Sequence, residues 1–173
     1  RRVRIMKIAI CDDESRVIEE VEKALNYYFG IKSIDAEIFS FEILNEIIRE
    51  GEKFGITDYP VHIKLDTGMH RLGFLEEDLP EVIDILKRQK VIRPISVFSH
   101  LAAADQPEMD KYTQSQFELF NRCCETLQSA FNHHIMRHIL NSTGISRFPE
   151  HQNDMVRLGI CLYGIKTMED GTQ

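Results

Sequence analysis

The sequence lacks several features that mark particular protein classes. Its 173 residues include no tryptophan and four cysteines, with no Cys-X-X-Cys pair and no spacing typical of a metal site. Cys11, Cys123, Cys124 and Cys161 are therefore expected to be free thiols in the interior. No apolar run approaches the roughly 20 residues of a membrane span, and the arginine-rich start has no signal-peptide pattern. These absences predict a cytoplasmic protein that makes no membrane contact.

The chain also lacks a basic excess and a flexible linker. Its formal net charge is −7, whereas a domain that binds a phosphate backbone usually carries a basic face, so no nucleic-acid partner is expected. No stretch rich in glycine, serine or proline divides the sequence. With 43% hydrophobic residues, the chain is long enough to bury one core. We therefore predict a single α/β domain over residues 1–173.

Apolar periodicity predicts strands that alternate with amphipathic helices, which is typical of parallel βα repeats. About six strands are expected, over 4–11, 37–40, 61–65, 95–100, 135–140 and 155–158. Helices are expected after the first four of them, beginning near Ser15, Phe41 and Leu79 and then around Phe117. An eight-stranded barrel takes about 250 residues, so the sequence predicts a partial TIM barrel or a flavodoxin-like open sheet. Its exposed edges favour a homo-oligomer.

The stretch VHIKLDTGMHRLGF, residues 61–74, places polar residues inside a predicted strand. Side chains alternate between the two faces of a strand, so His62, Lys64 and Asp66 share one face. A parallel strand that is covered by helices on both sides is almost wholly apolar. The pattern therefore indicates a functional site or a barrel interior, with an edge strand that has one wet face as the alternative.

This stretch resembles part of alanine racemase, and three later motifs extend the resemblance in the family's order and spacing. They are SVFSHLAAAD at 96–105, ILNSTGISRFPE at 139–150 and DMVRLGICLYGI at 154–165. The resemblance runs from about residue 36 to residue 165. It implies a barrel segment, the cofactor pyridoxal phosphate, and interconversion of L- and D-alanine, a small amino-acid substrate.

The resemblance also implies which residues contact the cofactor. Arg157 would donate to the pyridine nitrogen, Arg71 to the ring hydroxyl, and His100 would lie against the ring. Ser142 would hold the phosphate together with the backbone amides of Gly159 and Ile160, a typical anion environment. The remaining implied residues are Asn141, which orients this wall, Tyr163 as a further contact, and Lys64, which is carbamylated in many family members and pairs with the arginine that matches Arg71.

Two family features have no match in this sequence. The family's Schiff-base lysine belongs to the first barrel strand, but the first predicted strand here ends Ile10-Cys11-Asp12-Asp13. The family's catalytic tyrosine comes from a later domain, and this sequence ends at Gln173. No catalytic residue is assigned, and we expect weak cofactor binding with little or no turnover. A cofactor-binding module or chimeric scaffold without turnover is the alternative.

Residues 6–35 resemble instead the start of a response-regulator receiver domain, so a chimera joined near residue 36 is a second hypothesis. A receiver would bind Mg²⁺ through Asp12, Asp13 and Asp66, because this ion prefers a few carboxylate oxygens. The lysine that receivers carry after the fifth strand is missing. His134 and His138 have the spacing of a helical metal pair. Residues 135–140 are predicted as a strand, however, which points the two side chains the same way but too far apart for one ion, so no metal site is expected there.

Overall fold

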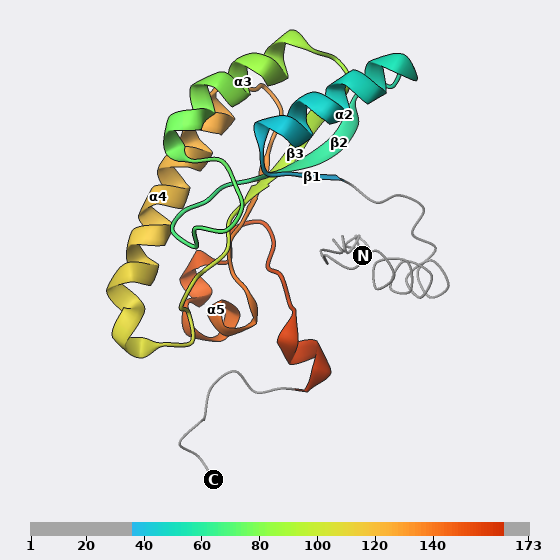
Figure 1. Cartoon of the computed structure of the whole chain (residues 1–173). Coiled ribbons are helices and arrows are strands. Elements are labelled where there is room, and N and C mark those ends of the chain that lie inside the picture. The colour runs from blue at the N-terminus through green and yellow to red at the C-terminus, as the bar shows by residue number, and fades with distance from the viewer. Residues whose placement is uncertain (1–35, 165–173) are drawn as a thin grey trace, which may run out of the picture. The chain divides into compact units, whose positions relative to one another are not determined.

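The computed structural model describes residues 36–164 (Figure 1). The strand predicted over 4–11, the helix after it and Cys11 lie outside the described residues, as does the receiver-like stretch 6–35. The strands are β1 (Ala36–Ile38), β2 (Tyr59–Lys64), β3 (Ile92–Phe98) and β4 (Met136–His138). The α-helices are α2 (Phe41–Lys53), α3 (Leu79–Arg88), α4 (Asp110–Ser129) and α5 (Ser142–Arg147). Short 3-10 helices are η1 (Glu76–Asp78), η2 (Pro107–Met109), η3 (Pro149–His151) and η4 (Ile160–Tyr163).

The four strands form one sheet in the order β1-β2-β3-β4. β2 pairs with β3 in parallel, and β3 pairs with β4 in parallel, so the predicted α/β class with parallel βα repeats is confirmed. Four strands are half the number in a closed (β/α)8 barrel. Within residues 36–164, the sheet is therefore open, as predicted.

The strand predicted over 155–158 is wrong, because this segment forms no ladder. The amide of Arg157 donates to the carbonyl of Leu140 at 3.0 Å, which holds the segment beside the end of β4. The chain then turns at Gly159 and enters η4.

Three helices pack on the sheet through apolar stripes that the sequence predicts. The Ser40 hydroxyl accepts from the amide of Ile43 and caps α2, so β1 ends before the predicted Ser40. Pro80 lies in the first turn of α3, where its missing N–H costs nothing. Figure 1 shows α3 and α4 along one side of the sheet. The buried residues on the strands and helices that form this core include Val61, Ile63, Leu65, Val97, Leu44, Val82, Phe120 and Leu127.

The cysteines of the described part are free thiols. Cys123 and Cys124 are buried on α4, and burial raises the pKa of the Cys123 thiol to about 11 and that of Cys124 to about 12. Cys161 is only half-buried, so the prediction of an interior thiol is wrong for it. Among residues 36–164, no helix has both the length and the apolar character needed to cross a bilayer.

β3 carries a bulge that sets which side chains meet across the sheet. Val61 lies opposite Pro94, but the next residue of β2, His62, lies opposite Ser96, so Ile95 is the extra residue. Proline cannot donate to a ladder and is tolerated inside sheets mainly at such irregularities. As a result, His62 and Lys64 face Ser96 and Phe98 on the side away from the helices.

The segment after β2 folds back onto the end of its own strand. The Asp66 amide donates to the Phe74 carbonyl and the Phe74 amide to the Lys64 carbonyl, both at 2.9 Å. Gly73 makes this return possible, because its φ of +134° favours glycine and a Cβ there would lie 2.5 Å from the backbone of Leu65 and Asp66. Arg71 is carried at the tip of this loop.

Replacing this glycine tests the loop. We expect Gly73→Ala to lower the free energy of unfolding by more than the roughly 1–3 kcal/mol of a strained backbone, because a clash with the main chain is added. Gly55→Ala is the matched control, since Gly55 also has a positive φ but has open space around it. Urea unfolding of both variants measures the difference. Equal losses would mean that the close approach at Gly73 has no energetic weight.

Candidate functional site

The side of β2 that faces away from the helices is polar and largely enclosed. β2 lies between β1 and β3, so the alternative of an edge strand with a wet face is wrong. His62 is 7% exposed and Lys64 is half-buried, while Val61 and Ile63 on the opposite face are fully buried. The structure therefore supports a site or a barrel interior on this face.

The guanidinium of Arg157 lies at the centre of this polar region. It donates to the carbonyl of Ser99 at 2.6 Å and to the carbonyl of His138 at 3.3 Å. It also donates to Nδ1 of His138 at 2.9 Å and to Nδ1 of His100 at 3.3 Å. Its carbon lies 4.9 Å from the centre of the Phe98 ring, a cation–π distance. Arg157 thus joins the carboxyl ends of β3 and β4.

Positive charge gathers around His100. Burial, followed by the charges of Arg157, Arg71 and Lys64 in that order, lowers the pKa of His100 to about 4. His100 is therefore a neutral imidazole at pH 7. Lys64 also lies over the face of Phe98, with its ammonium 5.4 Å from the ring centre. The structure brings together the predicted residues Arg71, His100, Lys64 and Arg157.

A second part of the site is formed where the segment after Arg157 meets the start of α5. The hydroxyl of Ser142 accepts from the amides of Gly159 at 3.0 Å and Cys161 at 3.4 Å, with Ile160 between them. The Asn141 side chain caps α5 by accepting from the amide of Gly144 at 2.9 Å. These predicted residues lie together, whereas Tyr163 is 82% exposed.

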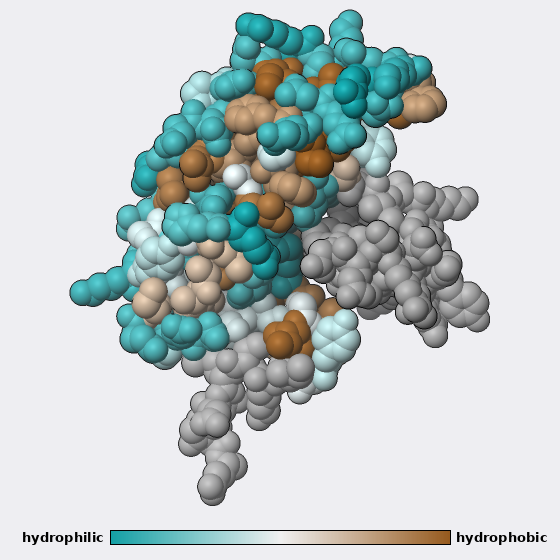
Figure 2. All heavy atoms as spheres, viewed as in Figure 1, coloured by the Kyte–Doolittle hydropathy of each residue, from teal (hydrophilic) through white to brown (hydrophobic). Residues whose placement is uncertain are grey.

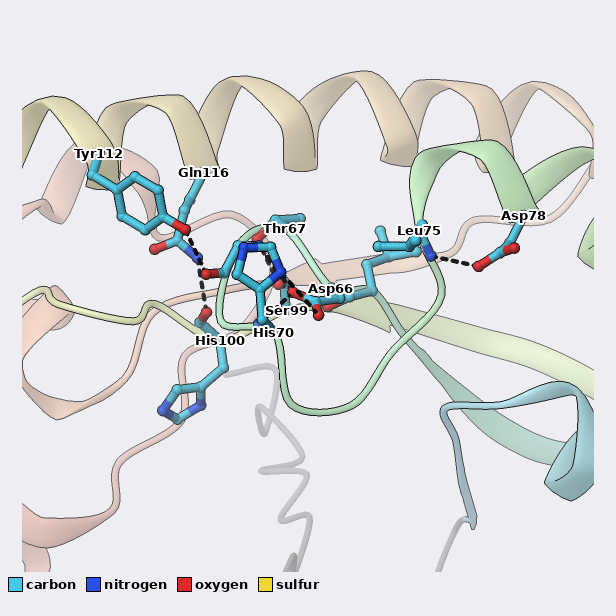
Figure 3. Close-up of polar contacts among 11 residues, drawn as sticks. Asp66, Thr67, His70, Leu75, Asp78, Ser99, His100, Tyr112 and Gln116 are labelled. Carbon is cyan, nitrogen blue, oxygen red and sulfur yellow. Dashed lines mark hydrogen bonds and ion pairs between the residues drawn. The ribbon is translucent and has the colours of Figure 1, made fainter.

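Helix α4 holds the two loops that carry the site residues (Figure 3). Tyr112 donates from its hydroxyl to the Gly68 carbonyl in the loop after β2, at 2.5 Å. Gln116, fully buried one helical turn later, donates to the His100 carbonyl at 3.1 Å and accepts from the Ala102 amide at 3.0 Å. Both loops are therefore fixed to one face of one helix.

The carboxylate predicted for Mg²⁺ has a structural role in the loop. Oδ1 of Asp66 accepts from the amides of Gly68 at 2.9 Å and His70 at 3.0 Å, as Figure 3 shows for the His70 side of the loop. Asp12 and Asp13 lie outside the described residues. Within residues 36–164, no group of three or more histidine, cysteine or acidic side chains could hold a metal ion. His134 pairs with Asp154, and His138 faces Arg157 instead.

Three residues that support the site were not predicted from the sequence. Ser96 and Gln116 are fully buried and hydrogen-bonded, and His138 was considered only as a metal ligand. One signal was available for the strand residues. His62 and Lys64 alternate along β2, and a polar residue stands inside each of the next two strands, Ser96 and His138, which indicates a continuous polar face. For Gln116, the helical pattern gave no signal beyond a polar residue at a core position.

Comparisons with known proteins agree on one family. A family model described as "Alanine racemase, N-terminal domain" matches residues 18–167. The alanine racemase of Lawsonia intracellularis is 36% identical over 135 residues, which cover 78% of this chain and 35% of that protein. The biosynthetic alanine racemase of Escherichia coli O6:H1 is 41% identical over 113 residues, 65% of this chain and 30% of that protein. The chain spans about a third of the length of these relatives.

Solved structures agree with the sequence matches. An alanine racemase of Clostridium difficile 630 aligns with a TM-score of 0.70 and 30% identity over 79% of this chain and 35% of that one. An alanine racemase of Bacillus anthracis with bound L-Ala-P aligns with a TM-score of 0.67 and 27% identity over 76% and 34%. The four-stranded sheet therefore corresponds to part of a TIM barrel, which decides between the two predicted architectures.

The family match also bears on the chimera hypothesis. It begins at residue 18, inside the stretch 6–35 that resembles a receiver domain, so the comparisons give no support to a junction near residue 36. The four motifs that carry the resemblance all lie inside the matched range. On this evidence, the chain belongs to the alanine racemase N-terminal domain family.

Proposed function

We propose that this chain forms the cofactor-binding part of a pyridoxal-phosphate-dependent alanine racemase. The observation that carries the proposal is the position of Arg157, which reaches His100 and His138 at the carboxyl ends of two parallel strands. In α/β folds, ligands bind at this end of the sheet. The relatives named alanine racemase support the reaction, and their greater length leaves the activity of this chain a proposal.

The residues present fit an anionic, planar cofactor. Three cationic side chains lie near His100, so a phosphate and a ring hydroxyl would meet favourable charge. A Cβ placed on Gly159 would have the Ser142 hydroxyl, 3.9 Å away, as its one neighbour within 4 Å among the described residues. A small anion therefore has both donors and room at this wall. Ser142, Gly159 and Ile160 would hold the phosphate, and Asn141 would fix the start of α5 beneath it.

Pyridoxal phosphate, when bound, would withdraw electrons from the Cα of the amino acid and so ease proton removal. The protein positions and tunes that chemistry. The guanidinium of Arg157 stays protonated, so it would face the pyridine nitrogen as a donor and keep a proton off it. His100, neutral because burial and neighbouring charges lower its pKa to about 4, would lie against the ring without adding charge. Arg71 would donate to the ring hydroxyl.

Lys64 has a supporting position beside the cofactor residues. Its ammonium lies over Phe98, and its charge acts on His100 together with that of Arg71. Two cations close together favour conversion of one of them to an anion. We therefore propose that in the working protein the neutral amine of Lys64 adds carbon dioxide and loses a proton, and that the resulting carbamate anion pairs with Arg71.

Pyridoxal phosphate binding tests the proposed site. We expect a reversible spectral change on titration, and Arg157→Ala to weaken the affinity by roughly tenfold to a hundredfold, because hydrogen bonds to a charged group are lost. Arg88→Ala is the matched control, since Arg88 is exposed on α3 and pairs with Asp84. Circular dichroism must show that both variants stay folded. Equal affinity of the two variants would exclude Arg157 from the site.

Catalysis by this chain alone is expected to be absent. Racemisation needs an acid or base on each face of Cα within hydrogen-bond reach, and neither family base is assigned in this sequence. Removing one member of a cooperating set costs nearly as much as removing all of them. Chiral chromatography of alanine after incubation with cofactor should therefore show no interconversion. Steady racemisation, with a borohydride-trapped adduct at one lysine, would show that another residue supplies the missing function.

Self-association is proposed as well. β4 ends the sheet in the described part, and an unpaired edge offers a template for another strand. Apolar side chains are also exposed at the C-terminal end of that part, where Figure 2 shows a hydrophobic group over η4. They are Leu158, Ile160, Leu162 and Tyr163. Sedimentation velocity over a range of concentrations should reveal a homo-oligomer, and a concentration-independent monomer would contradict this.

A further inference from the structure

We infer that His62 and Ser96 are positioning residues for Arg157, acting through His138 along a line of buried hydrogen bonds across three strands. The line runs from Nδ1 of His62 to the Ser96 hydroxyl, from that hydroxyl to Nε2 of His138, and from Nδ1 of His138 to Arg157. The inference rests on the proposed function only for the role of Arg157 toward the cofactor. We call these four residues the arginine support line.

The direction of each hydrogen bond follows from the chemistry of arginine. A guanidinium has donors and no acceptor, so Nδ1 of His138 must accept from Arg157 at 2.9 Å. His138 lies 2% exposed, and burial, then Arg157, then His62 lower its pKa, so it is neutral and carries its one proton on Nε2. Nε2 of His138 therefore donates to the hydroxyl of Ser96 at 3.1 Å.

The hydroxyl of Ser96 extends the same donor-to-acceptor order from His138 to His62 on β2. Ser96 is fully buried, and its hydroxyl has one proton to donate. Since it accepts from His138, the acceptor in reach for that proton is Nδ1 of His62. Leaving a buried hydroxyl proton without an acceptor would cost about 1–3 kcal/mol. His62 is thereby held with its proton on Nε2, and the donor of Arg157 together with the acceptor at residue 62 sets the tautomer of His138.

Packing keeps the line in place. The bulge at Ile95 puts His62 opposite Ser96, and His138 lies opposite Phe98 in the register of β3 and β4. The rings of Phe98 and His138 stack at 5.0 Å with 2° between their planes, while Arg157 lies over the same Phe98 ring. Both partners of the Arg157–His138 hydrogen bond are thus fixed by one aromatic ring.

Removing Nδ1 of His62, the acceptor at the end of the line away from Arg157, would change the site. Without an acceptor at residue 62, the Ser96 proton is free to turn toward Nε2 of His138. His138 would then carry its proton on Nδ1, where it opposes the donor of Arg157. A change two strands away would loosen the guanidinium that the proposed function places at the cofactor ring.

Two isosteric variants separate this role from a general packing effect. His62→Asn keeps an oxygen acceptor at the position of Nδ1, and His62→Leu has nearly the same shape without an acceptor. Both variants lack Nε2, so the loss of any contact made through Nε2 is the same in the two and cancels when the Leu variant is compared with the Asn variant. His133→Gln is a further control, because the His133 ring bonds to the Pro94 carbonyl, outside the line.

The measurement is nitrogen-15 NMR of histidine-labelled protein at pH 7, with and without pyridoxal phosphate. In the unmodified chain, we expect Nδ1 unprotonated in both His62 and His138. His138 should keep this state in His62→Asn and His133→Gln and change to protonated Nδ1 in His62→Leu, with a threefold to tenfold loss of cofactor affinity relative to His62→Asn.

The outcomes distinguish the inference from the proposed function. A protonated Nδ1 on either histidine in the unmodified chain overturns the inference, whatever the variants do. An unchanged His138 tautomer in folded His62→Leu, or equal cofactor affinity of the Leu and Asn variants, also overturns it. If the tautomers behave as expected but the unmodified chain does not bind pyridoxal phosphate, the support line stands and the proposed function fails.

Discussion

An arginine side chain donates hydrogen bonds and cannot accept them, and the polar face of this sheet is organised around that constraint at Arg157. Its two terminal nitrogens donate to two carbonyls and two imidazole nitrogens at the ends of β3 and β4. Because those histidines must accept, both are neutral and have fixed tautomers. The permanent charge of Arg157 thus keeps the two histidines beside it neutral, so the site holds one protonation state for a charged ligand.

The parallel sheet explains why residues far apart in the sequence meet around this charge. Lys64, His100 and Asn141 each follow or end a different strand, and the carboxyl ends of parallel strands share one edge. α4 then reduces the freedom of the connecting loops, since Tyr112 and Gln116 each hold a loop carbonyl. Helix packing and site geometry therefore depend on each other, although the helix contributes no ligand-facing group of its own.

Much of this arrangement could be predicted from local patterns. Alternation along residues 61–66 indicated a polar interior face, and Pro80 marked the start of α3, whereas Ser40, which caps α2, was assigned to the strand before it. The segment at Met155 misled because a short, mostly apolar segment does not require a ladder partner. Gln116 was missed because its partners are carbonyl and amide groups of a distant loop. Backbone groups leave no trace in composition or periodicity, so only the fold reveals them.

The bulge in β3 has an effect beyond its own strand. Residues that pair across a sheet share a face, so without the extra residue His62 would lie opposite Ile95, and Ser96 would turn toward the helices. A backbone irregularity of one residue thus decides whether Ser96 faces the helices or the polar interior. Pro94 cannot donate to a regular ladder and lies beside this irregularity. A regular ladder built from the same residues would turn the Ser96 hydroxyl toward the helices and away from His62 and His138, so the position of the bulge is itself part of the polar interior.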